Sequence, residues 1–244
     1  MADASEFDHP GEQKSLAGDS RTNRTGPFLV VGLGNPGDPY IWTPHNAGFM
    51  AIDRIAQQQG VVVQNRRSRA TTATCRIAGR QVVLAKPETF MNLSGLSVAA
   101  LVREFEADPA QDLLVIYDEL DLPLGTFKIR ERGSTAGHNG ARSVTGALGS
   151  QEWLRLRIGV RPDRATHGHG PVRGGPDLPP QALAGGEKRQ GKDYLLSPMR
   201  KADLTVLDEV LDRVATATRR IIEAGTAAAM NEFNRRSETP AEEK

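Results

Sequence analysis

Short apolar runs that alternate with segments of helical periodicity constrain the fold of this chain more than any other feature. An apolar run at residues 28–31 precedes a helical pattern over residues 46–59, and another at residues 113–117 precedes a helical pattern over residues 139–148. Runs of four or five apolar residues suit buried strands, whereas apolar spacings of three and four suit helices. Their alternation predicts an α/β fold with a twisted, mostly parallel or mixed sheet between helices.

The other patterned segments fit the same architecture. Residues 70–77 and 81–85 flank a short turn that contains Gly79, which predicts a hairpin. The longest amphipathic helical pattern covers residues 203–223, and a shorter helical pattern follows it over residues 226–233. Because 244 residues suffice for one sizeable domain, we expect a single folded domain over residues 27–234.

Three polar segments lack this periodicity. Residues 1–26 are rich in Gly, Ser, Asp and Arg, and residues 235–244 are mostly charged. Residues 163–192 are rich in Gly, Pro, His and Arg and are too long for an ordinary ordered loop. We therefore predict two disordered tails and, between them, a mobile insertion in the domain.

Composition excludes several classes of protein. The formal net charge of +1 excludes a uniformly basic nucleic-acid coat protein, although local basic patches remain compatible with it. The single cysteine, Cys75, excludes a disulfide framework and a cysteine-based zinc site. No apolar run approaches the roughly 18 residues of a membrane helix, and the N-terminal residues do not resemble a secretory signal. We expect a cytoplasmic protein without a membrane partner.

The run from Gly32 to Gly37 matches the dinucleotide-binding pattern G-x-G-x-x-G, but its context argues against that function. A dinucleotide site needs a helix that begins within the motif, whereas Pro39 disfavours helical geometry at Asp38. We expect the glycines to form a tight turn that presents Asn35 at the carboxyl end of a strand, where open α/β sheets build their sites.

Other polar residues also lie where predicted strands end or helices begin. They are His45, Asn46, Asn92, Asp118, His138 and Asn139. Each asparagine also suits a helix cap, and Asp118 also suits a turn. Their joint placement at strand–helix junctions favours a shared crevice.

A histidine beside an aspartate suits general-base catalysis. The carboxylate can hold one imidazole nitrogen while the other takes a proton from water. Asparagine amides both donate and accept hydrogen bonds, which suits an ester or amide substrate and a developing oxyanion. Because the chain has no G-x-S-x-G elbow, attack by activated water is favoured over a covalent intermediate. His167 and His169 lack an evident third ligand, so we predict no metal site.

Basic residues form three local groups. A solvated surface explains any one group, but together they suit contacts with nucleic-acid phosphates. The groups are Lys128, Arg130, Arg132 and Arg142; Arg66, Arg67 and Arg69; and Arg155, Arg157, Arg161 and Arg164. Tyr40 and Phe90 lie beside the polar candidates in sequence and suit stacking on a base or covering a peptide.

Six motifs, in order, resemble those of the bacterial-type peptidyl-tRNA hydrolase family between about residues 28 and 234. They are Val31-Gly32-Leu33-Gly34-Asn35-Pro36-Gly37 with Tyr40, Thr43-Pro44-His45-Asn46-Ala47-Gly48, Lys86-Pro87-Glu88-Thr89-Phe90-Met91-Asn92-Leu93-Ser94-Gly95, Asp118-Glu119-Leu120-Asp121-Leu122-Pro123-Leu124-Gly125, Gly137-His138-Asn139-Gly140 and Arg155-Leu156-Arg157-Ile158-Gly159-Val160. Each motif is weak by itself, but the ordered set is specific.

The resemblance implies a single α/β domain that hydrolyses the ester between a peptide and the 3′ end of tRNA, which recycles tRNA from aborted translation. It implies that His45 is the general base and that Asp118 stabilises its working state. It further implies that no cofactor is needed and that the protein is a monomer whose partner is peptidyl-tRNA.

The resemblance also assigns the substrate-binding residues. Asn35 would distinguish peptidyl from free aminoacyl substrates. Asn92 and Asn139 would position substrate and water, Tyr40 and Phe90 would line the site, and His138 and Arg142 would support it.

The sequence departs from the family pattern at three places. Pro44 stands where the family usually has arginine, the segment 133–137 is less glycine-rich, and the 163–192 insertion is longer than the family's loop. Two alternatives stay open: a non-catalytic RNA-binding relative, like the plastid members that support RNA splicing, or a hydrolase of another N-blocked aminoacyl ester. The presence of every expected polar site residue argues against lost catalysis.

Overall fold

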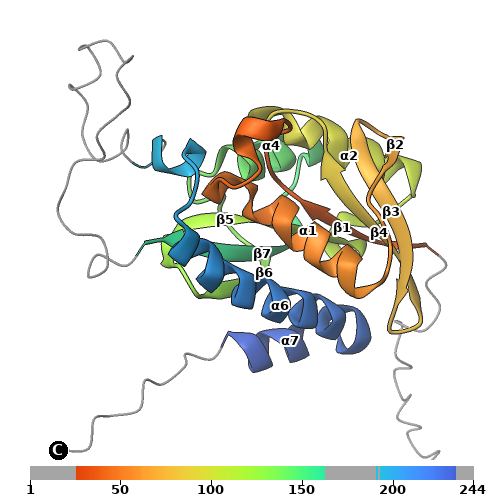
Figure 1. Cartoon of the computed structure of the whole chain (residues 1–244). Helices are drawn as coiled ribbons and strands as arrows, with labels where there is room; N and C mark the ends of the chain where they lie inside the picture. Colours follow the sequence, from red (N-terminus) through yellow and green to blue (C-terminus); the bar gives the residue numbers. More distant parts are fainter. Residues whose placement is uncertain (1–25, 163–190, 192, 235–244) are drawn as a thin grey trace, which may run out of the picture.

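The computed structural model describes residues 26–162, 191 and 193–234. The two predicted tails, apart from Gly26, and the predicted insertion, apart from Gly191, lie outside the described residues. The described part of the chain forms a seven-stranded sheet with helices on both faces, so the predicted α/β fold is confirmed (Figure 1). None of its helices is long and apolar enough to cross a membrane.

The sheet has the strand order β2-β3-β4-β1-β5-β7-β6. Its strands are β1 (Phe28–Gly32), β2 (Asn65–Arg67), β3 (Ala70–Ile77), β4 (Arg80–Pro87), β5 (Leu113–Pro123), β6 (Phe127–Arg132) and β7 (Glu152–Arg161). The central strands β4, β1, β5 and β7 are parallel, whereas β2, β3 and β6 pair antiparallel at the two sides. The carboxyl ends of β1, β4 and β5 therefore meet at one edge, where polar side chains from distant segments converge.

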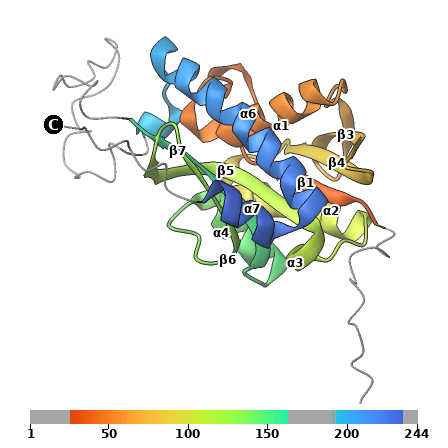
Figure 2. The same cartoon turned by 90° about the horizontal axis from the view of Figure 1, so that it is seen from below.

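Helices cover both faces of this sheet (Figures 1 and 2). They are α1 (Ala47–Gln58), α2 (Ser94–Glu104), α3 (Pro109–Asp112), α4 (Asn139–Leu148), α6 (Lys201–Ala224) and α7 (Thr226–Phe233), with 3₁₀ turns at Asp38–Tyr40, Pro44–Asn46 and Met91–Leu93. Apolar residues of α1, α6 and α7 form one core cluster with the sheet, and those of α2 and α4 form the other. Burial of both faces explains why β1 and the first five residues of β5 read as continuous apolar runs.

A close contact between two glycines brings helix α1 against the sheet. A Cβ atom added at Gly32 would lie 2.1 Å from the carbonyl oxygen of Gly48, and one added at Gly48 would lie 2.4 Å from the carbonyl oxygen of Ile116. Only glycine lets these backbones approach so closely. The contact fixes the start of α1, and with it the preceding His45 turn, beside the ends of β1 and β5.

We expect Gly48→Ala to destabilise the protein by about 3 kcal/mol, because the added methyl group meets backbone atoms that cannot move aside. Gly146→Ala is the matched control, since a Cβ at Gly146 in α4 meets nothing within 4 Å. That control should be neutral or slightly stabilising. Urea unfolding of both variants measures the difference, and equal stabilities would contradict the proposed tight contact.

The edge strand β6 is covered at one point by the end of the chain's last described helix. The side-chain amide of Asn234 accepts a hydrogen bond from the backbone nitrogen of Ile129 at 2.9 Å and donates one to its carbonyl oxygen at 2.9 Å. A single side chain thus makes the two bonds that a neighbouring strand residue would make. Phe233 packs against Phe127 in the same region, with ring centroids 5.9 Å apart.

Three expectations about the elements need correction. The short strand β2 was not expected, because Asn65–Arg67 carries no apolar residue. Strand β5 extends beyond residue 117 to Pro123, because β7 continues to pair with it. The alternation of Leu154, Leu156 and Ile158 with two arginines predicts a half-buried strand, yet Arg155 in β7 is only 1% exposed.

Candidate active site

Asp118 is the centre of the polar cluster at the carboxyl edge of the sheet. It lies within β5, opposite Ile158 of β7, and is 1% exposed. The sequence placed Asp118 directly after a strand, whereas the strand continues through it. The backbone of Asp118 is therefore fixed by pairing with β7 rather than lying in a flexible turn.

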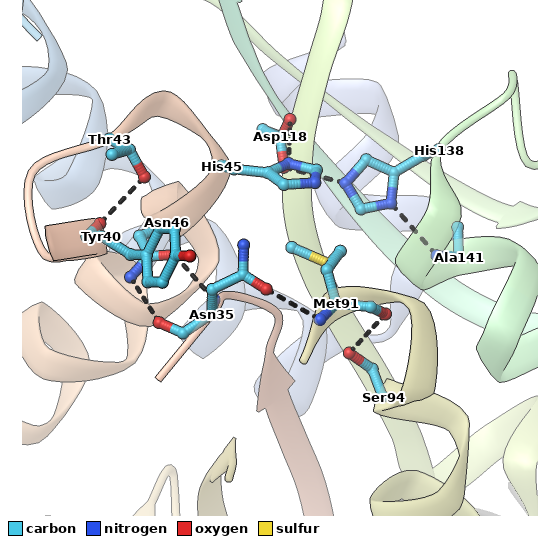
Figure 3. Close-up of polar contacts among 10 residues, drawn as sticks. All are labelled: Asn35, Tyr40, Thr43, His45, Asn46, Met91, Ser94, Asp118, His138 and Ala141. Carbon is cyan, nitrogen blue, oxygen red and sulfur yellow. Dashed lines mark hydrogen bonds and ion pairs between the residues drawn. The ribbon is translucent and has the colours of Figure 1, made fainter. Parts of the chain in front are cut away.

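His45 reaches this carboxylate from the 3₁₀ turn Pro44–Asn46. Its Nδ1 lies 2.9 Å from Oδ1 and 3.0 Å from Oδ2 of Asp118 (Figure 3). Pro44 occupies the first position of the turn, where a missing N–H group costs nothing, and the Thr43 hydroxyl donates to the Tyr40 carbonyl. The Nε2 atom of His45 has no hydrogen-bond partner among the described residues, and the side chain is 10% exposed.

His138 contacts the same carboxylate from the opposite side. Its Nε2 lies 2.8 Å from Oδ1 of Asp118, and its Nδ1 accepts a hydrogen bond from the backbone nitrogen of Ala141 at 3.1 Å. His138 is thus the N-cap of α4, whereas the sequence predicted Asn139 in that role. The ring of Tyr117 packs against His138 with centroids 4.7 Å apart. Burial raises the pKa of Tyr117 to about 12, so this phenol is neutral.

These contacts define the tautomers of both imidazoles. Since Nδ1 of His138 accepts a backbone N–H, its proton resides on Nε2 and is donated to Asp118. The carboxylate oxygens of Asp118 can accept more than one hydrogen bond, so they also accept the proton on Nδ1 of His45. In the neutral form of His45, Nε2 is therefore unprotonated, and this is the atom that a general base needs.

Electrostatics within the triad favour the charged forms of the partners. Burial lowers the pKa of His45, but the charge of Asp118 and the hydrogen bond to it raise the pKa by more, so it lies above the ordinary 6.5. Burial alone would raise the pKa of Asp118, yet His138 and His45 hold it well below its usual range. Asp118 is therefore a carboxylate throughout the physiological pH range.

Asn35 is anchored beside this triad by two neighbours. Its Oδ1 accepts from the backbone nitrogen of Met91 at 2.8 Å, and its own backbone nitrogen and carbonyl bond to the Asn46 side chain at 2.8 and 3.0 Å. The Asn35 amide nitrogen points away from Met91 toward His45 (Figure 3). Asn46 was considered as a helix cap, but its side chain makes no capping bond and instead fixes the Asn35 backbone.

The other predicted residues lie at the rim. The Asn139 side-chain oxygen accepts a hydrogen bond from Arg142, which fixes its amide. Asn92 and Phe90 lie at the 3₁₀ turn Met91–Leu93, where both are exposed, and Asn92 makes no hydrogen bond within the described part of the chain. Tyr40 is half-buried at the end of the turn that precedes Trp42. Direct contacts thus unite His45, Asp118 and His138, while the rim residues stay available to a ligand.

The basic groups differ from the expectation. Arg66 pairs with Glu88 and Arg67 with Glu104, and both pairs are solvent-exposed. Arg157 is partly buried and pairs with Glu119. Arg155 is buried against backbone carbonyls, so it cannot reach a phosphate. Arg164 lies outside the described residues. Sequence periodicity could not separate a buried arginine from an exposed one on β7.

One group of side chains in the described residues has ligand atoms close enough for a metal ion. The donor atoms of His45, Asp118 and His138 lie within 4.8 Å of one another. These atoms already bond to one another as donor and acceptor pairs, so each imidazole would have to give up its N–H proton to bind an ion. The arrangement suits proton transfer without further ligands.

A mixed α/β sheet with a histidine–aspartate pair at the carboxyl ends of its parallel strands defines a protein suited to hydrolysis by activated water. The family model described as peptidyl-tRNA hydrolase matches residues 29–173, and the chain belongs to that family.

Similar proteins extend this assignment over most of the chain. A protein of Acidobacterium capsulatum named peptidyl-tRNA hydrolase is 56% identical over 209 residues, which cover 86% of this chain and 96% of that protein. One of Koribacter versatilis with the same name is 48% identical over 212 residues, which cover 87% and 94%. The crystal structure of peptidyl-tRNA hydrolase from Acinetobacter baumannii matches with a TM-score of 0.72 at 27% identity, covering 85% and 94%.

Proposed function

We propose that this protein hydrolyses the ester bond between the peptide and the tRNA of peptidyl-tRNA, releasing free tRNA and an N-blocked peptide. The observation that carries the proposal is the contact of His45 Nδ1 with Asp118, which leaves Nε2 without a partner among the described residues. Membership of the peptidyl-tRNA hydrolase family supplies the substrate class.

In the proposed mechanism, His45 Nε2 takes a proton from water, and the resulting hydroxide attacks the ester carbonyl carbon. Asp118 stabilises the imidazolium that forms, because its carboxylate lies at hydrogen-bond distance from Nδ1. The tetrahedral intermediate collapses when the ribose oxygen leaves and takes the proton back from Nε2. The proton moves from water to His45 and then to the ribose oxygen of the substrate, so these steps use no cofactor.

Three amides serve the substrate in this proposal. The Asn35 amide nitrogen is free to donate because its oxygen is bound to Met91, which suits a peptide carbonyl that free aminoacyl-tRNA lacks. Asn139, oriented by Arg142, and exposed Asn92 position the ester and the water. Tyr40 and Phe90 line the entrance for the tRNA end and the peptide.

A non-catalytic RNA-binding protein is the alternative from another class. Burying a charged carboxylate costs free energy even when two imidazoles pair with it. A protein that only binds RNA would gain nothing in return for this cost. Purified protein incubated with peptidyl-tRNA distinguishes the two: we expect free tRNA to appear. Binding of peptidyl-tRNA without cleavage of its ester bond would favour the RNA-binding alternative. Cleavage of other N-blocked aminoacyl esters at equal rates would show a wider substrate class.

We expect tRNA binding to depend on salt through basic residues near the loop that carries His138. Lys128 and Arg130 lie on one face of β6 and form no ion pair with any described residue. Between roughly 50 and 200 mM salt, the dissociation constant should rise about tenfold, which corresponds to about two phosphate contacts. A K128A/R130A variant should bind with a flatter salt dependence, and an unchanged slope would contradict the role of these residues.

We further propose that residues 27–234 act as one catalytic domain in a monomer, since the site is built within one chain. We also propose that the protein acts in the cytoplasm, which a tRNA substrate supports.

A further inference from the structure

Arg155 is a fully buried arginine that the proposed mechanism does not use. It is 1% exposed within β7, and its guanidinium lies 3.7 Å from the ring centroid of Trp153. No carboxylate of the described residues lies within ion-pair distance of it. A buried charge without an opposite charge is unfavourable, so a residue held this way points to a specific task.

The guanidinium donates to backbone carbonyls rather than to acids. Its Nη1 lies 2.6 Å from the carbonyl oxygen of Gly133 and 3.2 Å from that of Ser134, while Nη2 lies 2.9 Å from that of Gln151. Gly133 and Ser134 begin the loop that leads from β6 to α4. Arg155 therefore fastens the start of this loop to the sheet.

The loop between Arg155 and the active site has unusual backbone conformations. Gly133, Ala136 and Gly137 have φ angles of 140°, 46° and 79°. A positive φ is unfavourable for alanine, so Ala136 is a strained position in this loop. The backbone nitrogen of His138 donates to the Thr135 carbonyl at 2.8 Å, and His138 then contacts Asp118. A continuous series of contacts thus runs from Arg155 to the catalytic carboxylate.

We propose that Arg155 is a positioning residue for hydrolysis, holding the 133–137 loop so that His138 and Asn139 face Asp118 and the substrate. This inference rests on the proposed function. Arg155 itself touches neither substrate nor reacting atoms, and it acts through His138. The planar guanidinium suits the task because it reaches several carbonyls at once, whereas the ammonium of lysine is a point donor.

The test compares Arg155→Lys and Arg155→Gln with wild-type enzyme on peptidyl-tRNA. Both should lower kcat about 10- to 100-fold, because displacement of a positioned group by about 1 Å has effects of that size. Their tRNA dissociation constants should change by less than about twofold, since phosphate contacts are elsewhere. Arg155→Gln removes both the buried charge and the guanidinium group. Because glutamine is neutral, this variant avoids the cost of an unpaired buried charge and keeps the test valid if the lysine variant does not fold.

Two comparisons separate positioning from general stability. Arg80→Lys is the control: Arg80 also lies over an aromatic ring, Phe28, but it is only partly buried, pairs with Asp112 and lies at the start of β4, far from the carboxyl edge. It should keep wild-type kcat. In a double-mutant cycle with His138→Ala, the combined loss should be smaller than the product of the two single losses.

Independent, multiplicative losses, or wild-type kcat in both Arg155 variants, would overturn the role of Arg155. Either result leaves the proposed function intact if wild-type enzyme releases tRNA. A wild-type protein that releases none would instead overturn the proposed function itself.

Discussion

Replacement of His45 by alanine is expected to lower kcat for peptidyl-tRNA about a thousandfold, because the variant lacks the base that activates water. Substrate binding should change little, since the imidazole contacts Asp118 rather than the bulk of the tRNA. Single-turnover release of tRNA measures the chemical step, and filter binding measures the affinity. Circular dichroism of the variant checks that the fold is retained.

His45→Asn is the sharper form of the same experiment. Its side-chain amide can still donate a hydrogen bond to the Asp118 carboxylate, which keeps the buried charge satisfied, but it cannot act as a base at neutral pH. We expect the same loss of kcat as in the alanine variant. Wild-type cleavage by the asparagine variant would exclude His45 as the base and assign its role to support of Asp118.

Replacement of Asp118 by asparagine is expected to change both the rate and its pH dependence. Asp118 raises the pKa of His45 by its charge and by a hydrogen bond, against the lowering effect of burial. Without the carboxylate only burial remains, so the pKa of His45 should fall below 6.5. Because neutral His45 is the active form, the acidic limb of the kcat/KM profile should move to lower pH.

The rate on the plateau of that profile should fall about 100-fold or more. An asparagine amide can donate to Nδ1 of His45, which would place the imidazole proton on Nε2 and block the base. Asp112→Asn is the control, since Asp112 is a similarly buried aspartate that pairs with Arg80 away from the site. Its profile should match that of the wild type. An acidic limb that stays in place in Asp118→Asn would contradict the assigned coupling between Asp118 and His45.

The sequence was informative where polar residues interrupt apolar patterns. His45 and Asp118 were predicted to share a crevice, because one precedes a helix and the other follows a strand, and such junctions meet at the carboxyl edge of a parallel sheet. Their roles as base and partner came from the family resemblance. Asn35 was predicted from the glycine turn that presents it. The hairpin and the helix of residues 226–233 were predicted because turn glycines and helical periodicity are local properties.

Other features depend on contacts between distant segments and so could not be predicted. Whether His138 or Asn139 caps α4 is decided by a ring nitrogen that accepts the Ala141 N–H while the other nitrogen meets Asp118. The burial of Arg155 depends on its position in a strand covered on both sides, although its alternation with leucines resembles a half-exposed strand. The direction in which a long side chain leaves the sheet is a tertiary property.

The bonds from Asn234 to Ile129 have a consequence for self-association. An open strand edge offers unpaired amides to any other chain, which is a common origin of aggregation. Here the side-chain amide of Asn234 pairs with the backbone N–H and C=O groups of Ile129, in the middle of the β6 edge. Asn234, at the end of α7, thus hinders the pairing of β6 with a strand of another molecule. A shortened protein that ends before residue 234 would leave this strand edge open and would aggregate more readily.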